Sequence, residues 1–120
     1  YFDFSVDASI TGDVVANYEI SAIKDTNSTL GNDDVKLYLE KKVGNNYEEV
    51  MAPKNFTPLT KSTDLGTMAG SMLLDSGSVS KSSSTDYRLR MWVDSDTVVD
   101  NLVKNFKVTV SVKAKIDLSK

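Results

Sequence analysis

The sequence predicts an all-β domain, an antiparallel sandwich of two sheets with a jelly-roll or Ig-like arrangement and about seven strands. Three observations lead to this prediction. Apolar and polar residues alternate along most of the chain, as they do in strands with one buried and one wet face. Clusters of turn-forming residues separate the alternating segments, and no segment has convincing helical spacing. The 120 residues are expected to form one domain, residues 1–120.

The first ten residues alternate without a break. One face of this predicted strand carries Phe2, Phe4, Val6, Ala8 and Ile10. The chain begins at Tyr1 without a Met, and we therefore expect that a leader peptide has been removed. A strand at the end of a chain can fold back onto its own domain or be donated to a neighbour. The sequence leaves both arrangements open for residues 1–10.

Two further strands and a hairpin are expected next. Residues 14–23 alternate, and residues 25–34 are rich in turn formers and read as a loop. Residues 35–43 alternate again, and a short connection at 44–46 leads into a return strand at 47–51. Two strands joined this tightly should pair antiparallel.

The second half of the chain contains long loops and the clearest strands. We expect irregular structure at 52–66, a strand at 68–74 and a long inter-strand loop at 75–85, where serine is abundant. A strand with strong alternation follows at 87–93, and then a loop at 94–104.

The last strand has the longest alternating pattern. Its predicted inward row is unbroken and consists of Phe106, Val108, Val110, Val112, Ala114 and Ile116. Clean alternation of this kind indicates that the apolar face is buried. Lysines in the outward row, such as Lys113 and Lys115, would discourage unwanted edge pairing.

Composition argues against several classes of function. The net charge is −3, which disfavours nucleic-acid binding because that binding relies on phosphate neutralisation by Lys and Arg. The chain has no Cys and no His, and so lacks the commonest general base and the commonest zinc ligands. We therefore predict no enzymatic activity, no cofactor and no metal centre. No apolar run approaches the roughly 18 residues of a membrane-spanning helix, and no membrane span is expected in the mature chain.

A partner-binding surface is a candidate on the outer face of the strand at 87–93. Arg88, Arg90 and Trp92 share that face by their spacing. A tryptophan flanked by two arginines could stack on a sugar or anchor a protein. The favoured alternative is that a loop covers Trp92 and that the arginines pack along it.

An acidic loop is a second candidate. Asp94, Asp96 and Asp100 offer the carboxylate oxygens that calcium prefers. The loop lacks the Gly and the terminal Glu of the EF-hand pattern, and a plain solvated acidic loop is the preferred interpretation.

Several segments together resemble a known grouping of proteins. They are Tyr1–Ser5, Asp34–Lys41, Asp86–Val93 and Asn105–Val112. The chain resembles secreted surface proteins of Firmicutes, in the grouping that includes camelysin and the biofilm matrix protein TasA. The resemblance implies a jelly-roll-like sandwich that is exported and stays extracellular or at the cell surface after its leader is cut. Some members assemble into fibres by donating the N-terminal strand of one subunit to the next, and the segment here that would have this role is Phe2–Ile10. The metallopeptidase label given to camelysin-type proteins does not suit a chain without His.

The leading hypothesis is a structural subunit of an extracellular filament or biofilm matrix fibre. The partner would be a second copy of the chain, joined head-to-tail through residues 1–10, and a repeated contact that does not close makes a filament. The alternatives are a monomeric cell-surface binding or adhesin module that recognises a glycan or a protein, and a virion decoration domain. Fold class alone does not separate these hypotheses.

Overall fold

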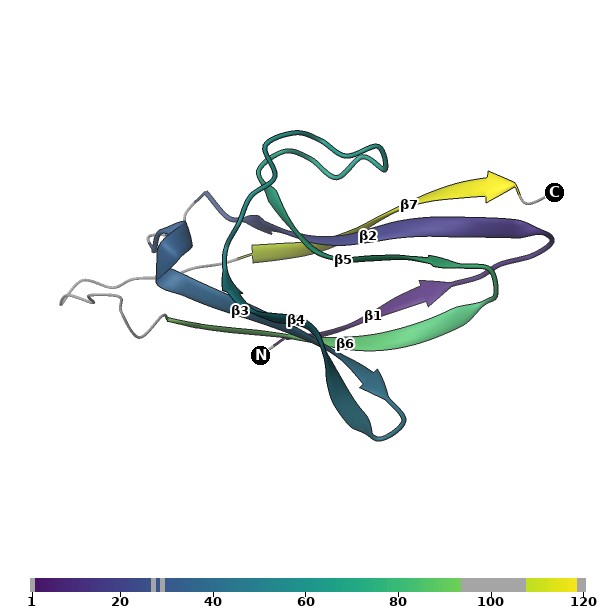
Figure 1. Ribbon diagram of the computed structural model, residues 1–120, viewed down its shortest axis with the longest axis horizontal. Coiled ribbons are helices and arrows are strands. Elements are labelled where there is room, and N and C mark those ends of the chain that lie inside the picture. The colour runs from purple at the N-terminus through teal and green to yellow at the C-terminus, as the bar shows by residue number, and fades with distance from the viewer. Residues whose placement is uncertain (1, 27, 29, 94–107, 119–120) are drawn as a thin grey trace.

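A computed structural model describes residues 2–26, 28, 30–93 and 108–118. The described residues form seven strands and one 3-10 turn (Figure 1). The strands are β1 Phe2–Ala8, β2 Val14–Lys24, β3 Val35–Val43, β4 Asn46–Asn55, β5 Ser71–Val79, β6 Ser83–Val93 and β7 Val108–Leu118, and the 3-10 turn η1 is Asn32–Asp34. The prediction of an all-β fold with about seven strands is confirmed.

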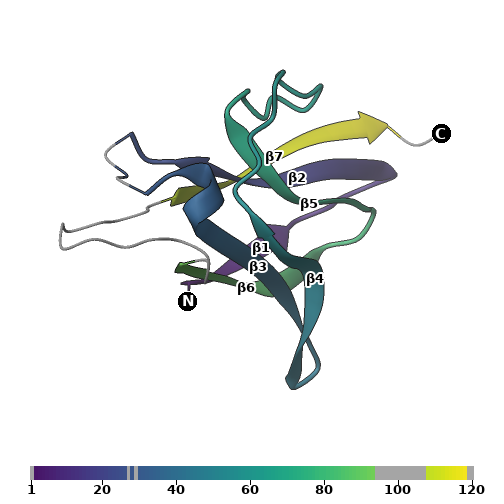
Figure 2. The same cartoon turned by 60° about the vertical axis from the view of Figure 1, so that its left-hand side comes forward.

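The strands form two antiparallel sheets with the orders β1-β6-β3-β4 and β5-β2-β7. Figures 1 and 2 show the three-stranded sheet as the upper layer and the four-stranded sheet as the lower layer. The pairs β1–β6, β2–β5 and β3–β4 follow from rolling up one long hairpin, as in a jelly roll. An Ig-like order is not observed, because β1 and β2 lie in different sheets.

The turn between β3 and β4 has a simple local cause. Gly44 has a φ of +64°, a backbone angle that residues other than glycine rarely adopt. A glycine in the first of the two turn positions suits a type II′ hairpin. The expected return strand at 47–51 is longer in the structure and runs to Asn55 through Pro53. The sheet tolerates this proline because β4 is an edge strand, where an N–H can be missing from the ladder.

The core lies between the two inward faces. It combines alternate residues of the strands with two loop residues and holds Ile20, Ala22, Leu30, Val35, Leu37, Leu39, Phe56, Met72, Leu74, Tyr87 and Leu89. Within the core, burial raises the pKa of the Tyr87 phenol, and a hydrogen bond with Tyr18 adds to this effect. A phenol with a raised pKa stays neutral, as a group inside a core should.

The serine-rich segment at 75–85, expected to be a loop, is mostly strand. β5 continues to Val79, β6 begins at Ser83, and three residues connect them. The prediction was wrong because pairing in the sheets outweighs the weak strand propensity of Ser and Gly. Gly77 lies opposite Tyr18, and a Cβ at Gly77 would come within 2.6 Å of the Tyr18 hydroxyl oxygen. The glycine therefore leaves room for the tyrosine ring.

Hydrogen bonds hold the connection between β4 and β5 to a side chain of β2. The hydroxyls of Thr63 and Thr67 donate hydrogen bonds to Glu19 Oε1, at 2.5 and 2.9 Å. Thr67 is almost fully buried, and its bond to Glu19 satisfies a hydroxyl that water cannot reach.

Candidate functional site

Strand β1 lies at the edge of the four-stranded sheet and pairs with β6 of the same chain. Phe4 lies opposite Tyr87, and the two rings stack with their centroids 5.3 Å apart. Phe2 stacks on Phe4 at 5.8 Å but remains 47% exposed. Four of the five residues expected to mediate assembly thus form one row along β1, namely Phe2, Phe4, Val6 and Ala8.

The outward-facing side chains of β1 form hydrogen bonds with side chains of β6. The three hydrogen-bonded pairs are Asp3 with Arg88, Ser5 with Asp86, and Asp7 with Ser84. Arg88 binds Asp3 through two nitrogens, at 2.8 and 3.1 Å, and the hydrogen bond holds the pKa of the Asp3 carboxyl below its usual value. Because each pair is also a register pair, the polar row specifies β6 as the partner and fixes the register.

Ile10, the fifth residue of the expected row, lies beyond the end of β1. Its amide N–H donates to Ser82 Oγ at 2.8 Å, and the Ser82 hydroxyl donates to the Ile10 carbonyl at 3.2 Å. The connection at 9–13 leads to β2 in the other sheet and contains Gly12, with φ of +79°. The end of β1 is therefore held to the start of β6 by one serine.

Strand β7 is one of the two edge strands of the three-stranded sheet as described and pairs there with β2 alone. Of its predicted inward row, Phe106 lies outside the described residues, and Val108 and Val110 pack against the core. Val112 and Ile116, however, are 42% and 63% exposed. The expectation of an unbroken buried row is wrong for this half of β7, because the described residues provide no strand that covers it.

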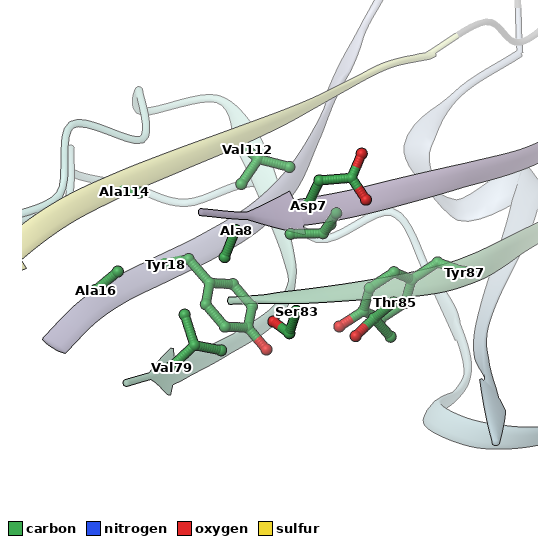
Figure 3. Close-up of a pocket in the computed structure, with 11 residues that line it drawn as sticks. Asp7, Ala8, Ala16, Tyr18, Val79, Ser83, Thr85, Tyr87, Val112 and Ala114 are labelled. Carbon is green, nitrogen blue, oxygen red and sulfur yellow. The ribbon is translucent and has the colours of Figure 1, made fainter. Parts of the chain in front are cut away.

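A cavity of about 90 Å³ lies between the sheets at this open side. Its walls come from the end of β1, from β7, and from β2, β5 and β6 (Figure 3). Val6 and Ala8 line it from β1, and Val112 and Ala114 line it from β7. One edge strand of each sheet, β1 and β7, therefore lines a cavity whose walls are mostly apolar.

The expected partner-binding residues share the outer face of the four-stranded sheet. Arg88 forms an ion pair with Asp3, and Arg90 forms one with Glu40 at 2.8 Å. Arg88 also lies 4.2 Å from the centroid of the Tyr47 ring. Trp92 is 41% exposed, more open than the interpretation of a covering loop implies. The sequence did not indicate that both arginines have carboxylate partners within the chain.

The acidic clusters do not assemble into a site within the described residues. Asp94, Asp96 and Asp100, the calcium candidates, lie outside them. Across residues 2–26, 28, 30–93 and 108–118, no three carboxylates come close enough to hold a metal ion. Asp34 has a local role, because its carboxylate accepts a hydrogen bond from the Gly31 amide at 2.7 Å.

Comparisons with known proteins give no relative for this chain. No family model, no curated protein and no solved structure matches it. The resemblance to camelysin and TasA stays a prediction. In the part of the chain that the structure describes, no helix has the length and apolar character that crossing a membrane requires.

Proposed function

We propose that the chain is a structural subunit of an extracellular filament, in which β1 of one copy lies beside β6 of the next. The observation that carries the proposal is the polar row of β1, whose three side-chain pairs match β6 in register. A second copy offers an identical β6. A donated β1 would make the same side-chain and main-chain bonds there as it makes in its own chain.

The way in which β1 is attached supports this exchange. Of the strands described, β1 pairs with β6 alone, and residues 9–13 connect it to β2. Five extended residues span at most about 17 Å, enough for β1 to leave its own slot and reach a close neighbour. When each copy gives its strand to the next and the arrangement does not close, the product is a filament.

Exchange competes with closure within one chain. The short connection holds β1 near its own slot at an effective concentration on the order of millimolar. Assembly should therefore rise steeply with protein concentration, and dilute protein should remain monomeric.

Sedimentation and negative-stain electron microscopy test the proposal. The protein is compared at low and high concentration with the variants Phe4→Asp and Ser5→Asn. Phe4 stacks on Tyr87, and complete burial of such a side chain is worth roughly 1.5–3 kcal/mol, so Phe4→Asp should weaken the binding of β1 to β6 at least tenfold, both in its own chain and in the next copy, and leave β1 unbound. Ser5→Asn changes the outward row and keeps a donor for Asp86, so this variant is the matched control.

The expected result is regular filaments for the unchanged chain and for Ser5→Asn, with none for Phe4→Asp. Equal assembly of the two variants would contradict a joint built on β1. Dispersed monomers at every concentration would contradict the filament itself. A monomeric binding module that uses the exposed Trp92 face would then be the better hypothesis.

A further inference from the structure

The exposed apolar row of β7 needs an explanation that exchange of β1 does not supply. The bonds between β1 and β6 would be the same within one chain and between two chains. They cannot by themselves favour assembly over the closed monomer. A filament of this kind needs an additional contact that exists only between copies.

The C-terminal half of β7 has the properties of such a contact. Val112, Ala114 and Ile116 lie on one face of the strand, and all three are exposed. Contiguous apolar surface on a soluble domain marks an interaction site more often than single exposed side chains do. Val110 and Val108 of the same row pack against the core, so the exposure is confined to one end of the strand.

The position of this surface identifies its occupant. Asp7 and Ala8, the last residues of β1, line the same cavity as Val112 and Ala114 (Figure 3). Residues 9–13 leave β1 at this point, and in an exchanged filament the chain of the next copy would enter here. The short reach of these residues brings the body of that copy against β7.

The exposed charges argue against pairing between the β7 edges of two copies, and they allow β7 to contact a different part of the next copy. Lys113 and Lys115 lie on the outward row, and two such edges side by side would oppose like charges. The chain as a whole carries a net charge of −3, so another part of the next copy is an electrostatically acceptable neighbour.

From these observations we infer that the apolar row Val112, Ala114 and Ile116 is a second subunit interface, covered in the assembly by the body of the next copy. This inference rests on the proposed function, because it is the exchange of β1 that brings the two copies together here. It explains why assembled protein would be favoured over closed monomers.

The test compares Ile116→Ser with Lys115→Gln in a pelleting assay that measures the critical concentration for assembly. Ile116 is mostly exposed in the single chain, so Ile116→Ser should leave the melting temperature of the monomer nearly unchanged. The critical concentration of the Ile116→Ser variant should rise about tenfold, because the variant lacks the apolar side chain that assembly would bury. Lys115→Gln is the adjacent outward control and should shift the critical concentration little.

Separate outcomes overturn the two proposals. If Phe4→Asp abolishes pelleting and Ile116→Ser behaves like Lys115→Gln, the β7 interface is wrong and the β1 joint stands. If the unchanged chain never pellets, the filament proposal is wrong. Analytical ultracentrifugation then tests whether the β7 row forms an interface in a smaller oligomer. A soluble oligomer that Ile116→Ser dissociates supports the interface, and a monomer throughout overturns it.

Discussion

Strands β6 and β7 share an alternating apolar pattern and have opposite surroundings. Both are 11 residues long; β7 alternates along its whole length, and β6 alternates only from Tyr87 onward. β6 lies between β1 and β3, and its inward residues Tyr87 and Leu89 are buried. β7 lies at an edge, and Ile116 in its inward row is 63% exposed.

The difference teaches what alternation encodes. The period of two fixes which side chains share a face, because it follows from the geometry of one strand. Whether that face is covered depends on the number of strands in the opposite layer and on neighbouring molecules. An inward row that none of the described strands covers is therefore where an interface should be sought.

The largest expected effect tests this contrast directly. Leu89→Ala should destabilise the domain by about 2–5 kcal/mol, because it leaves a cavity between two filled layers. Ile116→Ala should cost less than about 1 kcal/mol in the monomer, since most of that side chain is already in water. Chemical denaturation of dilute protein measures both. Similar losses would mean that β7 is as well covered as β6 in solution.

A second variant asks whether the open region is confined to β7. Gly77 lies on β5 of the same three-stranded sheet, and a Cβ there would meet the Tyr18 ring. Gly77→Ala should cost about 1–3 kcal/mol, because the ring must move within a packed layer. Thermal unfolding of this variant provides the measurement. A neutral result would indicate that the whole sheet is loosely packed.

The smallest expected effect concerns the polar row of β1. The pKa of Asp3 is lowered in the folded protein by the hydrogen bond from Arg88. Its contribution to stability is thus complete above the unfolded pKa of about 3.9 and disappears as the pH falls through the folded value. The effect should be small because the ion pair is solvent-exposed.

Melting temperatures recorded from about pH 6 to pH 2 check this prediction. Asp3→Asn should be less stable than the unchanged chain above about pH 4, and the two curves should converge at lower pH. Parallel curves across the whole range would show that the carboxylate of Asp3 contributes nothing through its charge.

Much of the fold could be predicted from the sequence, and the failures have physical causes. β2 and β3 were expected within one residue of their bounds, because apolar residues alternate there between strong turn signals. The strand structure of residues 75–79 was missed, since it depends on partners such as Tyr18 that are distant in the sequence. The apolar row of β1 was visible as a pattern. The pairing of Asp3 with Arg88 and the exposure of Ile116 were not, because both depend on which strands become neighbours.

The most direct test of the account is a disulfide between β1 and β6. The chain has no Cys, and Ser5 and Asp86 are register partners on neighbouring antiparallel strands, where Cα atoms lie close enough for a disulfide. The pair Ser5→Cys with Asp86→Cys is oxidised after assembly at high concentration. The pair Lys41→Cys with Glu48→Cys, within the β3–β4 hairpin, is the intramolecular control.

On a non-reducing gel, exchange of β1 predicts a ladder of linked subunits for the first pair and a single monomer band for the control. The ladder should collapse to monomer on reduction. A monomer band for the first pair, from a sample that contains filaments, would show that β1 stays beside its own β6 and would contradict the central claim.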